Sequence, residues 1–216
     1  MKNNFDNTFQ KISIHYDKLF DKYGSNVKSS QQSSRVTQIK RMKILTKNII
    51  FKKNDKVFDF GCGTGYLLNF LKKQKKFKGV YHGCDISEKI ISHNIKKFKS
   101  SKVLFLNQNI LKKKLYVKYD YIFINGTFNN YTGNNIQWMK KILIKLFVNT
   151  KKKLIFNNLS RYVDYKDNKL FYADPSEIFD FCKKKLSKNV SINHSYSIKK
   201  GVIPYEFTTI VSKFSE

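Results

Sequence analysis

Proline, cysteine and arginine are all scarce in this chain of 216 residues. Only two prolines and three cysteines occur, and Cys62, Cys84 and Cys182 show no CxxC spacing. Isolated cysteines exclude a disulfide scaffold and a cysteine zinc site, and they suit a reducing compartment. No His, Cys and carboxylate cluster suggests a metal. We therefore expect a cytoplasmic protein without a bound metal.

Long apolar runs are absent as well. No stretch approaches about 18 consecutive apolar residues, so no transmembrane helix and no membrane partner are predicted. The first six residues lack the apolar segment of a secretory signal. Mean hydropathy is −0.50, yet hydrophobic residues make up 41% and aromatic residues 15%. Such a composition excludes global disorder and predicts one domain, or one domain with a small extension.

Acidic residues are few. Asp and Glu number 15 against 43 Lys and Arg, which gives a net charge of +28. That balance is typical of proteins that bind nucleic acid or an anionic surface. Nearly all basic residues are lysine, however, whereas phosphate and base readers favour the arginine fork. Residues 89–119 hold nine lysines and no acid. A basic patch is therefore expected, and a solvated face is favoured over a nucleic-acid site.

The chain divides near residue 50. Residues 1–50 are predicted to form a helical N-terminal cap, with helices on either side of Gly24 and the second over about 35–47. Residues 51–216 alternate strands and helices. Strands are expected at 56–60, 79–84, 103–106, 119–124 and 153–156, and helices at 66–73, 87–98, 135–148 and 176–186. Two last strands, 190–195 and 206–212, have no helix between them.

This alternation predicts the fold class, a doubly wound α/β sheet that is mostly parallel. Strands that are separated by helices form a parallel sheet with helices on both faces. The two last strands should form an antiparallel hairpin at the sheet edge. The expected total is seven strands.

The most specific motif is a glycine loop after the first expected strand. Glycine occupies every second position at Gly61, Gly63 and Gly65, which lets the backbone take positive φ and approach a ligand closely. In a doubly wound sheet this loop lies at the carboxyl ends of the strands, where ligands bind. Tyr66 stands where a dinucleotide fingerprint needs glycine, and no P-loop Gly-Lys-Ser/Thr follows. A turn without a ligand is the less favoured alternative.

Polar side chains flank this loop. Asp59 can attract a cationic ligand, directly or through water. Asp85 ends the second expected strand, about twenty residues on, where a carboxylate accepts both hydroxyls of a ribose; it also suits the start of the next helix. Asn107, Gln108, Asn109 and Ile110 end the third strand, and an amide side chain there is expected either at an adenine edge or in turn chemistry.

Asp-x-Gly-x-Gly-x-Gly at 59–65, followed by Asp85 at a strand end, resembles the class I S-adenosylmethionine-dependent methyltransferases. The resemblance covers residues 56–160 well, and the later elements agree in order. It implies a Rossmann-like fold, S-adenosylmethionine as cofactor and methyl transfer as activity. Asn109 departs from the family's usual Asp and removes its charge. The residues that the resemblance assigns to the cofactor are Arg41, Asp59, Gly61, Cys62, Gly63, Asp85, Ile86, Asn109, Ile110, Asn125 and Gly126.

Segments 38–41, 124–129 and 172–177 look like a bacterial subgroup associated with surface-polysaccharide or sugar-modification pathways. That likeness implies that Gln38 or Arg41 touches the cofactor carboxylate. For Arg41, a solvated helix residue is the alternative. The acceptor of this reading is a small molecule, such as a sugar or its nucleotide-linked form, methylated at oxygen or nitrogen.

Residues for the acceptor are expected in the loops after the fourth and fifth strands, the second of which is long enough for a lid. The candidates are Asn129, Tyr131, Arg161, Tyr162 and Tyr172. His194 is a candidate base, although such a histidine is more often structural. The fourth strand is not followed by the Asn/Asp-Pro-Pro-aromatic motif, which argues against methylation of exocyclic base amines. An RNA methyltransferase and a non-catalytic binding protein of the same fold are the alternatives.

Overall fold

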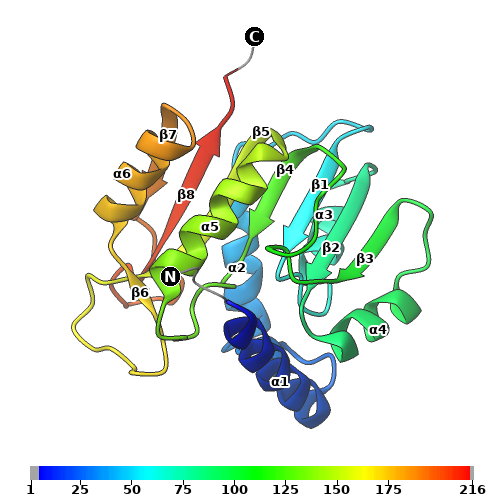
Figure 1. Cartoon of the computed structure of the whole chain (residues 1–216), viewed down its shortest axis with the longest axis horizontal. Coiled ribbons are helices and arrows are strands. Elements are labelled where there is room, and N and C mark those ends of the chain that lie inside the picture. Colours follow the sequence, from blue (N-terminus) through cyan, green and yellow to red (C-terminus); the bar gives the residue numbers. More distant parts are fainter. Residues whose placement is uncertain (1–4, 215–216) are drawn as a thin grey trace.

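A mixed sheet runs through the centre of the computed structural model, which describes residues 5–214 (Figure 1). Seven strands follow the order β3-β2-β1-β4-β5-β8-β7, and β6 pairs with β5 beside this path. The bounds are β1 Lys56–Phe60, β2 Val80–Asp85, β3 Val103–Asn107, β4 Tyr119–Ile124, β5 Thr150–Ser160, β6 Tyr172–Ala173, β7 Asn189–Asn193 and β8 Glu206–Ser212. The predicted Rossmann-like fold is confirmed.

Strands β1 to β5 are mutually parallel, and β8 joins β5 antiparallel. The central strand β4 is buried at all six positions, as expected for a parallel strand that helices cover on both faces. The predicted hairpin is present, with β7 at the edge and β8 between it and β5.

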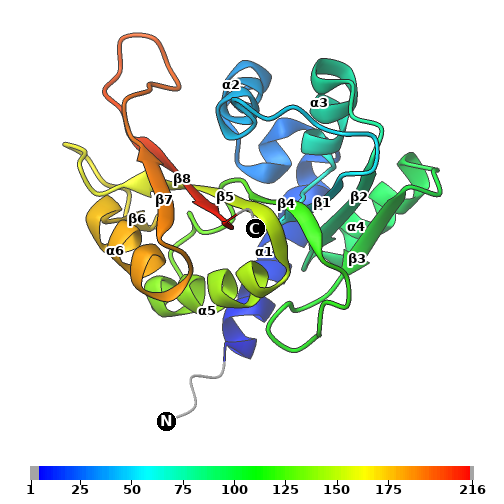
Figure 2. The ribbon, with the colours of Figure 1, turned by 90° about the horizontal axis from the view of Figure 1, so that it is seen from above.

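Helices cover both faces of the sheet, as Figure 2 shows from above. Helices α2, α3 and α4 pack on one face, and α5 and α6 pack on the other. Two hydrophobic clusters fill the space between the helices and the sheet. The bounds are α1 Asp6–Tyr23, the 3₁₀ helix η1 Val27–Ser30, α2 Arg35–Leu45, α3 Tyr66–Lys75, α4 Glu88–Lys97, α5 Asn135–Val148 and α6 Pro175–Lys185.

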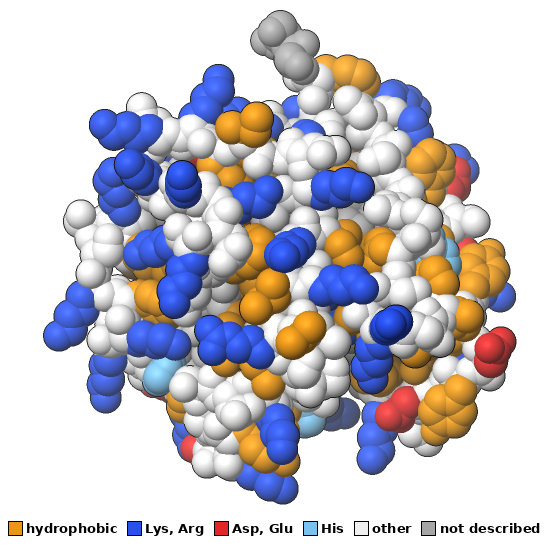
Figure 3. All heavy atoms as spheres, turned by 180° about the vertical axis from the view of Figure 1, so that it is seen from behind, with side chains coloured by type: hydrophobic (Ala, Val, Ile, Leu, Met, Phe, Trp, Pro, Cys, Tyr) orange, Lys and Arg blue, Asp and Glu red, His pale blue; other side chains and the backbone are white. Residues whose placement is uncertain are grey.

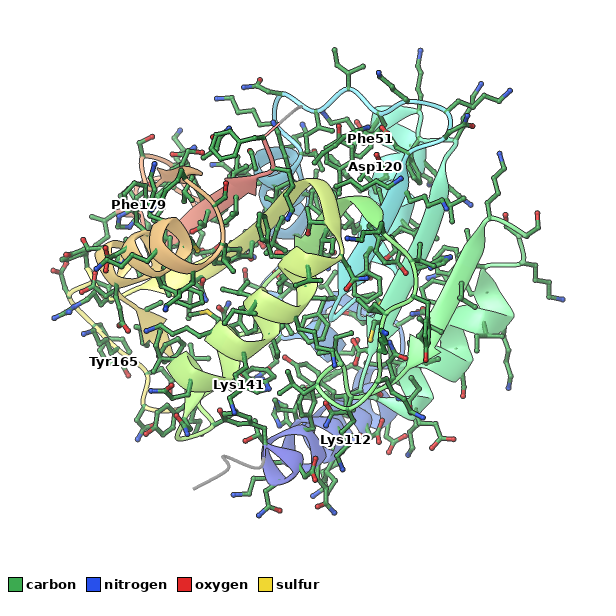
Figure 4. The ribbon with its side chains drawn as sticks, turned by 45° about the horizontal axis from the view of Figure 1, so that its top comes forward. Phe51, Lys112, Asp120, Lys141, Tyr165 and Phe179 are labelled. Atoms are coloured by element: carbon green, nitrogen blue, oxygen red, sulfur yellow. The ribbon has the colours of Figure 1, made fainter. Side chains whose placement is uncertain are left out.

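Helix α1 crosses the carboxyl ends of the strands (Figure 1). Its Phe9 is buried edge-to-face against Trp138 of α5, with ring centroids 5.6 Å apart. Lys112 and Lys141, which Figure 4 labels beside the start of α1, hold it from outside. Lys112 pairs with Asp6 at 2.8 Å, and the Lys141 ammonium lies over the Phe5 ring.

The proposed cap of residues 1–50 contributes to the common core. Met42 and Leu45 of α2 belong to the same hydrophobic cluster as Leu67 and Leu68 of α3. A boundary near residue 50 stays a prediction, and residues 1–4 of the cap lie outside the described part of the chain. Within residues 5–214, no helix is both long and apolar enough to cross a membrane.

Candidate active site

The loop between β1 and α3 has the positive backbone angles that its glycines permit. Gly61, Gly63 and Gly65 have φ of +74°, +49° and +76°. A Cβ atom at Gly61 would lie 2.2 Å from Thr127 Oγ1, so this position has no room for a side chain. The loop therefore passes directly against the end of β4, and its backbone is open to a ligand on the other side.

Asp85, the last residue of β2, is tied to this loop. Its Oδ2 accepts the Gly63 N–H at 2.9 Å, and its Oδ1 accepts the Ser87 N–H at 3.1 Å. Burial raises the pKa of Asp85, while the N–H groups of Ser87 and Gly63 oppose that rise because they favour the carboxylate. The carboxyl group thus joins the glycine loop to the start of α4.

Asp59 lies in β1 beneath the loop and is 2% exposed. The Tyr81 hydroxyl donates to its Oδ2 at 2.5 Å. Burial raises the pKa of Asp59 to about 7; the Tyr81 hydrogen bond opposes this shift and the charge of Asp85 adds to it. Asp59 therefore changes its charge near neutral pH.

A cavity opens above the glycine loop, and most of the predicted cofactor residues line it. Its floor is formed by Asp59, Gly61, Cys62, Gly63, Asp85, Ile86, Asn125 and Gly126. Gln38 of α2 also lines it. The sequence predicted that either Gln38 or Arg41 would contact the cofactor carboxylate. The structure thus brings residues from the ends of β1, β2 and β4 together.

The third strand contributes Gln108 and not the predicted Asn109 and Ile110. Asn109 Oδ1 accepts the Leu111 N–H at 2.9 Å, so its amide serves the turn, which was the alternative expectation. Ile110 is fully buried in the core. Gln108 lines the cavity, and its buried Nε2 has no hydrogen-bond partner within residues 5–214.

The roof of this cavity was not found from the sequence. Phe9, Ile12 and Tyr16 of α1 and Met42 of α2 line it from above, and Trp138 of α5 closes one side. Their helical spacing indicated only that these residues would be buried. Which cavity they would cover depends on how α1 crosses the sheet, and no local pattern encodes that.

Arg41 lies outside the first cavity and lines a second one. Its Nε donates to Glu206 Oε1 at 2.8 Å, and its Nη2 also contacts that carboxylate. Nη1 donates to Gln32 Oε1 at 2.5 Å. Burial alone would lower the pKa of Arg41, but the hydrogen bonds and charge of Glu206 outweigh it and raise that pKa. Arg41 is therefore neither a solvated residue nor placed at the first cavity.

The second cavity adjoins the first. Tyr16, Ser30, Gln32 and Gly126 line both. Asn129, a predicted acceptor residue, lines the second cavity, and its buried Oδ1 has no hydrogen-bond partner among the described residues.

The other predicted acceptor residues line neither cavity. Tyr131 and Tyr162 point to solvent and are more than half exposed. Arg161 pairs with Asp174 at 2.7 Å, and the Tyr172 hydroxyl accepts the Asp167 N–H.

His194 also lies outside both cavities. Its Nε2 is 3.2 Å from the carbonyl oxygen of Pro204, which fits the structural alternative. Within residues 5–214, no group of His, Cys, Asp and Glu is arranged to hold a metal ion.

Comparison with known proteins agrees with this geometry. A family model described as a methyltransferase domain matches residues 51–195. A Mycobacterium tuberculosis protein named as a methyltransferase is 32% identical over 164 residues, which cover 73% of this chain and 92% of that protein. Ribosomal RNA small subunit methyltransferase A of Mesomycoplasma hyopneumoniae is 33% identical over 100 residues, covering 46% of this chain and 35% of the relative.

Among solved structures, the fold is similar to magnesium protoporphyrin IX methyltransferase from Synechocystis with S-adenosylmethionine bound. The TM-score is 0.68 over 99% of this chain and 100% of that one. Sequence identity is only 14%, so this likeness concerns the fold.

Proposed function

This chain belongs to the S-adenosylmethionine-dependent methyltransferases, and from that premise we propose that its acceptor is a small molecule. The finer proposal is a sugar or a nucleotide-linked sugar, methylated at oxygen or nitrogen. Bound S-adenosylmethionine supplies an electrophilic methyl group. The chain's own residues align the acceptor with it and exclude water.

We propose that the floor of the first cavity holds the cofactor. Gly61 and Gly63 line this cavity with positive φ angles, so that their backbone, which carries no side chain, would face the methionine part. Asp85 would accept the ribose hydroxyls, as a carboxylate at this strand end does in related folds. The unpaired Nε2 of Gln108 would donate to the adenine edge. Asp59 would attract the ammonium group.

The observation that supports a small acceptor is the roof. Side chains of α1 and α2 line the first cavity together with the glycine loop, and side chains from several separate elements line the adjoining second cavity, which narrows access to the cofactor site. A folded polymer cannot enter such a space unless it inserts an extruded unit. The RNA alternative is supported by the net charge of +28 and by similarity to a ribosomal RNA methyltransferase over 46% of this chain.

The Asp85→Ala variant tests the cofactor site. Hydrogen bonds to a charged group contribute about 1.5–3 kcal/mol, so we expect S-adenosylhomocysteine to bind about 10–100-fold more weakly in calorimetry. The control is Asp180→Ala, whose carboxylate is exposed and pairs with Lys184 on the same helix. Unchanged affinity in Asp85→Ala would contradict the proposed ribose contact. Loss of binding without loss of biological function would favour a scaffold role.

Transfer of isotope-labelled methyl groups tests the acceptor class. The protein is incubated with labelled S-adenosylmethionine and either the low-molecular-mass fraction or the RNA fraction of a cell extract. We expect mass spectrometry to find label in the low-molecular-mass fraction. Label confined to RNA would overturn the proposal in favour of an RNA methyltransferase.

A further inference from the structure

We infer that the second cavity is the acceptor site and that the part of the acceptor inside it is uncharged and bears hydroxyl groups, as a sugar ring does. This inference rests on the proposed function and names the chemistry of its substrate. The second cavity lies between the η1–α2 connection, the loop after β4 and the start of β8.

The two cavities meet at Tyr16, Ser30, Gln32 and Gly126, which line both. An acceptor in the second cavity therefore reaches the first only past these four residues. The Tyr16 hydroxyl accepts the Asn130 Nδ2–H at 3.0 Å, which leaves its own proton free for an acceptor oxygen. Burial raises the pKa of Tyr16, and the charge of Asp85 adds to that shift, so the phenol stays protonated. Tyr16 thus donates and orients, and does not act as a base.

Arg41 and Glu206 form the charged wall of the second cavity, and because they pair with each other their charges cancel. Glu206 is 1% exposed, and its two oxygens accept Arg41 and the Asn157 Nδ2–H. Arg41 in turn donates to Glu206 and Gln32. A charged acceptor group would lose its hydration without gaining an unpaired counter-charge in this wall. The remaining charge, Lys199, is on the exposed β7–β8 connection, so the phosphate of a nucleotide-linked sugar would lie at the rim.

Asn129 supplies the unsatisfied polar group that points to a ligand. Its Oδ1 is buried without a partner among residues 5–214. A buried amide oxygen of this kind requires a hydrogen-bond donor. A hydroxyl of the acceptor meets that need. The only aliphatic side chains in the wall are those of Leu159 and Leu170, so a large apolar acceptor is disfavoured.

The chemical step follows from this placement. The acceptor hydroxyl oxygen forms a bond to the methyl carbon, and the bond between that carbon and sulfur breaks with its electron pair left on sulfur. The hydroxyl proton passes to bulk water at the solvent-exposed end of the second cavity, where Lys199 lies, away from the methyl group. The products are a methyl ether and S-adenosylhomocysteine.

Asn129→Ala separates acceptor recognition from stability. The probe is the labelled low-molecular-mass product that the wild type forms, with its purified acceptor as substrate. We expect the KM for this acceptor to rise about tenfold, while the affinity for S-adenosylhomocysteine and the thermal midpoint stay as in the wild type, because Oδ1 has no hydrogen-bond partner in the described part of the chain. The control is Asn189→Ala at the exposed start of β7, with unchanged kinetics.

Tyr16→Phe tests the junction. Removing the donor hydroxyl should lower kcat several-fold or more, and Tyr116→Phe, an 87% exposed tyrosine, should lower nothing. Because Tyr16 stays protonated, its side chain should add no pH dependence to kcat in the wild type. The pH profile of kcat should therefore have the same shape in Tyr16→Phe. Labelled product with unchanged kinetics in both Asn129→Ala and Tyr16→Phe would overturn the acceptor site alone. Methyl groups found on a carboxylate, a phosphate or an ammonium would overturn the uncharged class.

Label in RNA only, or no label in either fraction while S-adenosylhomocysteine binds, would overturn the proposed function and the acceptor site together. Label in small molecules with altered kinetics in the two variants supports both.

Discussion

At Gly61 the backbone angle φ is +74°, and an added Cβ would meet the Thr127 hydroxyl at 2.2 Å. Two separate costs therefore forbid a side chain there: the left-handed backbone and the clash with the end of β4. Gly133 has φ of +84° and no atom within 4 Å of an added Cβ, so only the backbone cost applies at that position. Substituting Gly61 and Gly133 in turn therefore separates the cost of the left-handed backbone from the cost of the contact with Thr127.

We expect Gly133→Ala to lower the free energy of unfolding by about 1–2 kcal/mol, the cost of the left-handed backbone alone. Gly61→Ala should lower it further and should abolish binding of S-adenosylhomocysteine, because Thr127 and the loop must move apart. Urea unfolding and calorimetry measure the two effects. Equal destabilisation by both substitutions, with cofactor affinity intact, would show that the loop does not need its close approach.

Asp59 gives the stability a pH dependence of known sign. Its pKa in the folded protein is about 7, above the ordinary value of 3.8, because the carboxyl group is buried. Between these two values the folded state binds a proton that the unfolded state has lost. The contribution of Asp59 is therefore complete below about pH 4 and declines as the pH rises to about 7.

We expect Asp59→Asn to remove this decline, since the amide cannot ionise. The difference in unfolding free energy between the variant and the wild type should grow as the pH rises, by at most about 1.4 kcal/mol per pH unit, and should level off above pH 7. Urea titrations at a series of pH values measure it. A difference that is independent of pH would mean that Asp59 has an ordinary pKa.

At the scale of elements, α1 is fastened to the start of α4. Ser87 caps α4 by accepting the Ile90 N–H, and its hydroxyl donates to Asp17 of α1 at 2.5 Å. Ser34 caps α2 by accepting the Thr37 N–H, but its side chain contacts only its own helix. Both serines therefore cap a helix. Ser87 in addition holds α1, which lines the first cavity, against the start of α4.

Ser34→Ala should cost about 1 kcal/mol of unfolding free energy, as the loss of a serine cap usually does. Ser87→Ala should cost more and should also speed proteolysis within α1, because the bond to Asp17 is lost as well. Thermal unfolding and limited proteolysis of the two variants provide the measurements. If both variants released α1 equally, the bond between Ser87 and Asp17 would have no role in closing the site.

Elements with strong local patterns were predictable from the sequence. The bounds of β4, α5 and β8 match the predicted ones, and Ser87 caps α4 as expected. Strand β5 is longer than predicted. Its polar Asn157 and Asn158 do not look like strand residues in the sequence, but tertiary contacts bury them. The two-residue β6 and the short η1 are too brief for any periodicity to indicate.

The site residues also divide into those that a local pattern predicts and those that only tertiary contacts place. The glycine loop and Asp85 were predictable, because a fixed spacing after a strand determines where they lie. The one-residue difference between Asn109 and Gln108 depends on a turn, and the pairing of Arg41 with Glu206 joins residues 165 positions apart. No local pattern carries either of these facts, so the second cavity could be recognised only in the folded molecule.

On the scale of the whole molecule, positive charge is spread over the surface. Figure 3 shows the face of the helices α2 and α3, where lysine and arginine side chains are scattered and acidic ones are few. Residues 35–54 and 66–79 contain no acid. Lysines also end α6 on the opposite face of the sheet, at Lys183, Lys184 and Lys185. A charge spread in this way attracts polyanions without a defined site.

We therefore expect RNA to bind at low salt and to lose about 10³-fold or more in affinity between about 50 and 200 mM salt, without accepting labelled methyl groups. Replacing Lys72 and Lys73 of α3 by Glu should weaken this binding as much as replacing Lys184 and Lys185 of α6, since a diffuse charge has no preferred face. Filter binding at several salt concentrations provides the measurement. Salt-resistant binding that only the α3 substitutions abolish would instead identify a dedicated RNA surface on the face of α2 and α3.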